Sequence, residues 1–180
     1  MSDVLAGKVF GVTGWKNSGK TTLVVKLVHY FVSQGLRVGT IKRAHSGFDI
    51  DHPQTDSYRH REAGAQQVMI ASNKRWAMMH ELGDNGEVPL AELLTQFSDI
   101  DLVLVEGYKA ESHPKIQALR PSISVQPMNN EKAHNIVALA AESPVNAADL
   151  NVDGLVLDLN NVEAIAAYIT DYLELKPRDD

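Results

Sequence analysis

An eight-residue segment near the N-terminus, Gly14 to Thr21, has the residue types of a loop that holds phosphate groups. It matches the pattern G-x-x-x-x-G-K-[ST] at every fixed position. In such a loop the glycines let backbone N–H groups point at a phosphate, the lysine reaches the β- and γ-phosphates, and the final hydroxyl ligates magnesium. The alternative is a glycine-rich turn with a solvated lysine. The predicted nucleotide-binding residues are Gly14, Trp15, Lys16, Asn17, Ser18, Gly19, Lys20, Thr21 and Thr22.

A carboxylate at the end of an apolar run is the predicted partner of that loop. The run Leu102 to Val105 is typical of a strand covered on both faces, and Glu106 follows it directly. We expect this strand to lie beside the one that leads into the loop. Ligands bind at the carboxyl ends of strands in open α/β sheets, so Glu106 is predicted to hold magnesium. The alternative is a strand-end carboxylate without a ligand. Asp101 is expected to start the strand or to face solvent.

A polar loop after the second predicted strand supplies further candidates. Asp49 and Asp51 lie two residues apart, so both can face one side of an extended segment. We expect the loop to follow a strand next to the one before the phosphate loop, where segments that sense the γ-phosphate lie. The alternatives are a loop that touches only solvent and one that contacts a partner protein. The predicted catalytic residues are Lys20, Asp49 and Glu106, and the predicted metal ligands are Thr21, Asp49 and Glu106. Lys42 is a candidate for balancing the charge of the phosphates. His45 and His52 are candidates for contacting a partner protein or a second anion.

Hydrophobic periodicity predicts a chain in which strands and helices alternate. Short apolar runs predict strands, and stripes at helical spacing predict helices. Most of the strands fit a parallel sheet, so the fold class is predicted as α/β, a P-loop NTPase three-layer fold in one nucleotide-binding domain over residues 1–180. A capping box is expected at Asn160 and Glu163. The predicted strands are 8–13, 38–41, 68–71, 76–79, 102–105, 115–119, 136–140 and 155–157, and the predicted helices are 21–34, one ending near 65, 89–97 and one at the C-terminus.

Composition excludes several classes of protein. The 180 residues carry a net charge of -6, which argues against general nucleic-acid binding because that needs a basic face. The absence of cysteine removes disulfides and thiolate metal sites. No apolar run is long enough to cross a bilayer, and no signal peptide is recognisable at Met1. A cytoplasmic protein with no membrane partner is expected.

The motifs together resemble a known family, over most of residues 8 to 175. The chain resembles the MobB family of molybdopterin-guanine dinucleotide biosynthesis adapter proteins. The phosphate loop is shared with many families, whereas the segments after it are more particular. The resemblance is carried by Gly14–Thr22, Thr40–Lys42, Phe48–Pro53, Asp56–Ser57, Arg61–Ala65, Arg75–Met78 and Leu102–Lys109.

The resemblance implies a function and partners that the residues alone do not give. It implies a P-loop GTPase fold, a homodimer, and GTP and Mg2+ as bound ligands, with weak GTP hydrolysis. It implies a role in molybdenum cofactor maturation beside the guanylyltransferase MobA, with molybdopterin as a further candidate ligand.

Two questions stay open at the level of sequence. The usual guanine-reading motif N-K-x-D is absent: Asn73 and Lys74 begin it, but Trp76 ends it. Glu142 is a second candidate for contacting the base, and an exposed turn carboxylate is the alternative.

The other function considered is a metabolic kinase or ligase, which usually needs a lid with arginines. Residues 121–134 hold only Lys132 as a basic residue, which favours the adapter.

Overall fold

The computed structural model describes residues 8–44, 47–120, 122, 127–128, 133–142 and 155–176. The chain divides into two compact units, one formed by Met1–Arg43 with Leu90–Asp180 and the other by Ala44–Pro89. Each unit has its own sheet. The single nucleotide-binding domain over residues 1–180 stays a prediction.

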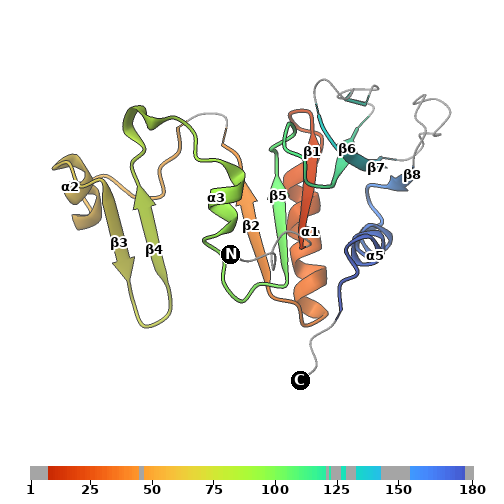
Figure 1. Ribbon diagram of the computed structural model, residues 1–180, viewed down its shortest axis with the longest axis horizontal. Coiled ribbons are helices and arrows are strands. Elements are labelled where there is room, and N and C mark those ends of the chain that lie inside the picture. The colour runs from red at the N-terminus through yellow and green to blue at the C-terminus, as the bar shows by residue number, and fades with distance from the viewer. Residues whose placement is uncertain are drawn as a thin grey trace. The chain divides into compact units, whose positions relative to one another are not determined.

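The first unit is built on a six-stranded parallel sheet with the strand order β2-β5-β1-β6-β7-β8 (Figure 1). The expected pairing of β5 with β1 is confirmed. The expectation that the strand ending at Lys42 also lies beside β1 was wrong, because β2 pairs with β5. Parallel strands bring their carboxyl ends to one edge, where loop residues from several strands meet. The strands are β1 (Val9–Gly14), β2 (Val38–Lys42), β5 (Leu102–Glu106), β6 (Lys115–Leu119), β7 (Ile136–Ala141) and β8 (Leu155–Asp158).

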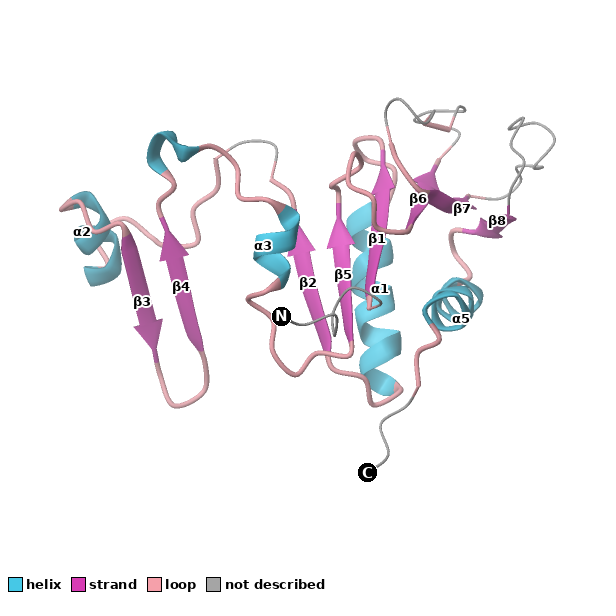
Figure 2. Ribbon diagram, in the orientation of Figure 1, coloured by secondary structure: helices cyan, strands magenta, loops and turns pink. Residues whose placement is uncertain are grey.

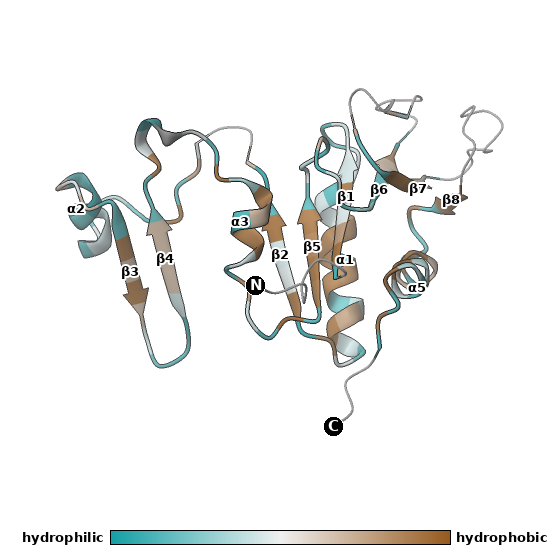
Figure 3. Ribbon diagram, in the orientation of Figure 1, coloured by the Kyte–Doolittle hydropathy of each residue, from teal (hydrophilic) through white to brown (hydrophobic). Residues whose placement is uncertain are grey.

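Helices pack on both faces of this sheet, which gives the predicted three layers (Figure 2). On one face, α1 (Lys20–Ser33) and α5 (Val162–Leu173) pack against alternate residues of the central strands. On the other face, Leu90 of α3 (Leu90–Leu94) packs against the remaining residues of β1 and β5. Because β5 is covered on both sides, all of its residues are buried and it is continuously hydrophobic up to its last residue (Figure 3).

The start of α5 differs from the sequence-based expectation by one residue. Asn161, not Asn160, caps the helix: its side-chain oxygen accepts a 3.0 Å hydrogen bond from the backbone N–H of Ala164. This bond satisfies one of the N–H groups that the first turn leaves unpaired. The helix itself is present as predicted, with Ile165 and Ile169 fully buried.

The second unit is small and carries little apolar core. It contains α2 (Asp56–Glu62), the strands β3 (Gln67–Ala71) and β4 (Trp76–His80), and a 3-10 turn at Gly83–Asn85. The two strands pair antiparallel, with Met69 opposite Met78. Only the pair Val68 and Met79 is buried within this hairpin, while the opposite face stays exposed. Across the described ranges of both units, every helix is too short or too polar to span a bilayer.

Candidate nucleotide-binding site

The loop between β1 and α1 takes a conformation that only glycine tolerates at two positions. Gly14 has a φ of +148°, and a Cβ there would lie 2.5 Å from the carbonyl oxygen of Ala118 and 2.5 Å from Oγ of Ser18. Gly19 has a φ of +91° and forms the N-terminal boundary of α1. These positions match the fixed glycines of the sequence pattern, so the pattern is explained by the geometry of the turn.

The lysine of the loop is held over the loop itself. Nζ of Lys20 donates a 2.6 Å hydrogen bond to the carbonyl oxygen of Trp15. Burial lowers the pKa of Lys20; Glu106 opposes this shift and Lys42 adds to it. The ammonium is therefore fixed in a partly desolvated position, where an anion interacts with it more strongly than it would in bulk water.

Thr21, Lys42 and Glu106 meet at one point, although they come from three different elements. The hydroxyl of Thr21 donates a 2.8 Å hydrogen bond to Oε1 of Glu106. Nζ of Lys42 lies 3.3 Å from that same oxygen and 3.3 Å from the Thr21 hydroxyl. The side chain of Glu106 is only 10% exposed, so its charge is compensated by these two partners.

This arrangement fits a magnesium ion better than a metal held by protein ligands alone. No group of three or more His, Cys, Asp or Glu residues converges within the described part of the chain. Thr21 and Glu106 offer two hard oxygen atoms side by side. Magnesium keeps water and phosphate oxygens in its coordination sphere and takes only one or two protein ligands, so this donor set suits it.

An open pocket of about 300 Å³ lies along the start of α1. Five of the nine predicted nucleotide-binding residues line it, namely Asn17, Gly19, Lys20, Thr21 and Thr22. Of the others, Trp15 supplies the carbonyl that holds Lys20, Lys16 is exposed, and Ser18 is buried beneath the turn.

Arg120 also lines this pocket, and sequence reasoning missed it. It follows β6, the strand next to β1 on the side away from β5. A basic residue directly after an apolar strand was a usable signal, but only the strand order shows which loop it reaches. Glu142, a candidate for contacting the base, follows β7 and places Oε1 3.9 Å from Nε of Arg120.

Asp101 is neither a site residue nor a solvent-facing one. It is 8% exposed and Oδ2 accepts a 2.7 Å hydrogen bond from the backbone N–H of Arg37. The carboxylate thus ties the start of β2 to the start of β5, at the edge of the sheet away from the Gly14–Thr21 loop. Of its two expected positions, the start of the strand is confirmed, since Asp101 directly precedes β5, and exposure to solvent was wrong, because a backbone donor takes the place of water.

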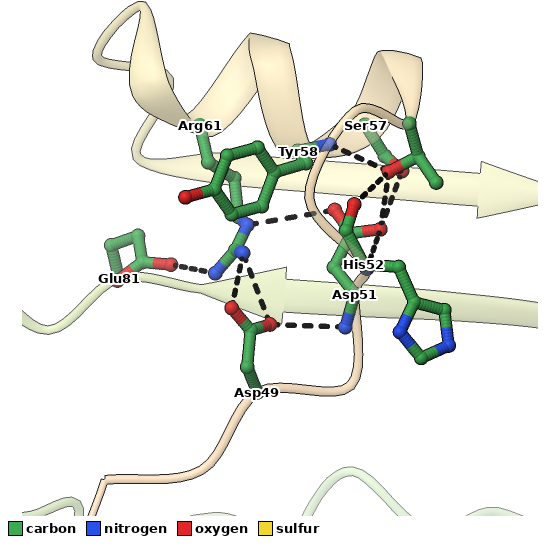
Figure 4. A network of polar contacts seen from close by, with 8 residues as sticks. Asp49, Asp51, His52, Ser57, Tyr58, Arg61 and Glu81 are labelled. Carbon is green, nitrogen blue, oxygen red and sulfur yellow. Dashed lines mark hydrogen bonds and ion pairs between the residues drawn. The ribbon is translucent and has the colours of Figure 1, made fainter.

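In the second unit, Asp49 is bound by an arginine (Figure 4). Nη2 of Arg61 donates hydrogen bonds of 3.0 Å and 2.8 Å to the two oxygens of Asp49, and Nη1 donates one of 2.9 Å to Glu81. The hydrogen bonds from Arg61 hold the pKa of Asp49 below its usual range, and the two carboxylates raise the pKa of Arg61. Arg61 therefore joins the 47–55 loop to the end of β4.

Asp51 fixes the same loop from the inside. Its Oδ1 accepts hydrogen bonds from the hydroxyls of Thr55 and Ser57 and from the backbone N–H of His52 (Figure 4). Burial raises the pKa of Asp51, but these donors outweigh it and the net shift is downward.

His45 and Lys132 lie outside the described residues.

Comparison with known proteins gives a consistent family. Residues 9–142 match the family model "MobB: Molybdopterin guanine dinucleotide synthesis protein B". The molybdopterin-guanine dinucleotide biosynthesis adapter protein of Escherichia coli (strain K12) is 36% identical over 176 residues, covering 94% of this chain and 98% of that protein. The adapter protein of Haemophilus influenzae is 38% identical over 167 residues, covering 92% and 89%.

Solved structures agree with the sequence relatives. The crystal structure of a MobB protein homolog from Bacillus stearothermophilus superposes with a TM-score of 0.66 at 26% identity, covering 93% of this chain and 99% of that one. The fold is shared with Bacillus subtilis MobB, with a TM-score of 0.72 at 21% identity and coverage of 95% and 99%. With a family model matched over most of its length and full-length relatives above 30% identity, this chain belongs to the MobB family.

Proposed function

We propose that this protein is a GTP- and Mg2+-binding adapter of molybdopterin-guanine dinucleotide biosynthesis, with weak intrinsic GTP hydrolysis, working in the cytoplasm beside the guanylyltransferase MobA. The adapter role is supported by the names of its full-length relatives. The observation that carries the nucleotide site is the hydrogen bond between Thr21 and Glu106, because it brings a strand-end carboxylate to the end of a complete phosphate-loop pattern.

Each residue has a distinct task in this proposal. The backbone N–H groups from Gly14 to Gly19 and the start of α1 receive the phosphates. Lys20 leaves the Trp15 carbonyl and binds the β- and γ-phosphates. Thr21 and Glu106 hold magnesium, which would neutralise charge on the β- and γ-phosphates.

Weak hydrolysis is supported by the contacts that the two proposed catalytic carboxylates already make within their own units. Hydrolysis needs a group that orients the attacking water. Glu106 is already engaged with Thr21 and Lys42, and Asp49, the other proposed catalytic carboxylate, is bound through both oxygens by Arg61. Asp49 can act in hydrolysis or at the metal only after it leaves Arg61. A slow reaction suits an adapter, whose bound nucleotide then persists.

The nucleotide and the reaction class can be tested together. Binding of GTP and of ATP is measured with Mg2+ present, with and without molybdopterin, and MobA is captured on the immobilised protein with GTP or GDP bound. We expect GTP to bind more tightly than ATP and MobA to be retained. Rapid transfer of labelled phosphate to a metabolite of a cell extract would instead support the kinase or ligase alternative.

We also propose that the protein is a homodimer that pairs through the exposed face of the β3–β4 hairpin. Met69, Trp76 and Met78 share one face of these strands and are 61%, 67% and 42% exposed. An isolated two-stranded sheet is only marginally stable in water, so a second copy that covers this face would stabilise it. A face that pairs with its own copy gives a closed twofold dimer.

The oligomeric state tests the dimer. In sedimentation velocity, the unmodified chain should run as a dimer and Trp76→Glu as a monomer, since a buried charge in the interface is costly. Lys74→Glu, an exposed change in the same hairpin's turn, serves as the control and should leave the dimer intact. A Trp76→Glu variant that remains dimeric would exclude this face.

A further inference from the structure

Arg120 lies at the edge of the candidate site, and one of its side-chain donors has no acceptor within the described part of the chain. Its Nε is buried and has no hydrogen-bond partner among the residues that the structure describes. The nearest carboxylate oxygen of Glu142 is 3.9 Å away, which is too long for a hydrogen bond. A guanidinium presents five donors in one plane, so a buried and unsatisfied N–H calls for an acceptor that binds here.

The backbone holds Arg120 beside the Gly14–Thr21 loop. In the register of β1 with β6, Gly14 lies opposite Ala118, so Arg120 leaves the sheet at the edge where the loop begins. The guanidinium packs on the turn: a Cβ at Gly19 would lie 3.3 Å from both Nε and Nη2 of Arg120. The second fixed glycine of the pattern is thus also the residue that leaves room for this arginine.

Glu142, which follows the next strand, β7, forms an ion pair with the guanidinium of Arg120. The backbone N–H of Glu142 donates a 3.0 Å hydrogen bond to the carbonyl oxygen of Leu119, which fixes it beside Arg120. The two side chains are 35% and 40% exposed, so the ion pair between them contributes little to stability on its own. The position of Arg120 is set by its neighbours, while its side chain remains 35% exposed at the pocket.

The strand order decides which part of a nucleotide Arg120 faces. Glu106 ends β5 on one side of β1, and Arg120 follows β6 on the other side. Thr21 and Glu106 would hold magnesium, which would supply charge neutralisation at the β- and γ-phosphates, so we expect those phosphates on this side. We then expect the α-phosphate on the β6 side, where Thr22 and Arg120 line the pocket.

We propose that Arg120 is a nucleotide-binding residue of this protein, a second fixed cation that donates hydrogen bonds to the α-phosphate of the bound nucleotide, as Lys20 does to the β- and γ-phosphates. This proposal rests on the nucleotide site proposed above. Arginine suits the task because its planar fork binds phosphate oxygens through two parallel bonds.

The test is nucleotide binding by the full chain, measured by isothermal titration calorimetry with Mg2+. Arg120→Ala should weaken GTP and GDP by the same factor, about tenfold to a hundredfold, because both nucleotides carry the α-phosphate. Arg120→Lys keeps the charge without the fork and should recover part of the loss. Arg37→Gln, which removes a cation at the opposite edge of the sheet, is the control and should bind as the unmodified chain does. Thermal melting of each variant checks that it is folded.

The outcomes separate this inference from the proposed function. If Lys20→Ala loses affinity and Arg120→Ala stays within twofold of the unmodified chain, the role of Arg120 is overturned and the nucleotide site stands. If Arg120→Ala weakens GTP but not GDP, the contact is with the γ-phosphate and the placement at the α-phosphate is wrong. If the unmodified chain binds neither nucleotide, both proposals fall.

Discussion

The hydroxyl of Thr21 donates a hydrogen bond to Oε1 of Glu106, a residue 85 positions further along the chain. The parallel pairing of β1 and β5 makes this contact possible, since Val12 lies opposite Glu106 in the register and both strands end at the same edge. Thr21 then follows within the first turn of α1. This hydrogen bond therefore brings together the Gly14–Thr21 loop and the end of β5, the two segments predicted to bind a nucleotide and magnesium.

Replacing Glu106 with glutamine tests its predicted role at the metal. The amide keeps the size of the side chain but removes the charge that attracts a cation, so binding of GTP in the presence of Mg2+ should weaken by about tenfold or more. Binding without Mg2+ should change little. The measurement is GTP affinity with Mg2+ and with a chelator.

Asp101→Asn is the matched control for that experiment. It neutralises the acid at the other end of the same strand, where the carboxylate accepts a hydrogen bond from the Arg37 backbone. Nucleotide binding should be unaffected, although the variant should unfold at a lower temperature. A larger loss of Mg2+-dependent binding in Asp101→Asn than in Glu106→Gln would show that the wrong carboxylate has been assigned.

The contacts of Asp49 favour a supporting role for this residue. If Asp49 serves to anchor Arg61, Asp49→Asn weakens this ion pair and Arg61→Ala removes it. Both variants should then lower the melting temperature, Arg61→Ala by more because it also removes the hydrogen bond to Glu81, and both should leave GTP hydrolysis by the isolated protein unchanged. Slower hydrolysis in Asp49→Asn together with normal hydrolysis in Arg61→Ala would instead place Asp49 at the γ-phosphate or the metal.

Much of the fold was predictable because its signals are local. Apolar runs and helical stripes placed the strands and helices, and continuous hydrophobicity of Leu102–Val105 indicated a strand covered on both faces, as β5 is. The position of β2 was not predictable in the same way, since the order of parallel strands depends on crossovers that leave no mark on a single strand.

The residues of the candidate site were likewise predictable only where their signals are local in the sequence. The pattern from Gly14 to Thr21 and the acid at Glu106 are recognisable because their chemistry needs fixed spacing. Arg120 has no such spacing, and only its strand's place beside β1 brings it to the pocket. The ion pair between Arg61 and Asp49 could not be predicted from the sequence either, because a charged loop followed by a charged helix is usually solvated.

His113 predicts a pH dependence of stability between pH 6.5 and 4. Burial, with a smaller contribution from Lys115, lowers the pKa of His113 to about 4 from an ordinary value of 6.5. In this window the unfolded chain takes up a proton at His113 and the folded chain does not. The free energy of unfolding therefore falls as the pH is lowered, by about 1 to 2 kcal/mol at pH 5 for this partly buried group.

Guanidinium denaturation at pH 7.5 and pH 5 measures this effect. The unmodified chain should lose more stability between the two pH values than His113→Gln, which does not titrate at that position. Equal losses in the two proteins would show that His113 is protonated in the folded state as readily as in the unfolded chain.

The most direct test of the central claim is GTP binding by Lys20→Ala, measured by isothermal titration calorimetry in the presence of Mg2+. Lys20 is only partly buried, and its ammonium donates a hydrogen bond to the Trp15 carbonyl within its own loop, so the variant should keep nearly the same melting temperature. The loss of the charge at the β- and γ-phosphates should abolish measurable binding of GTP, which the unmodified chain binds. An unchanged affinity for GTP in a folded Lys20→Ala variant would contradict the assignment of this loop as the nucleotide site.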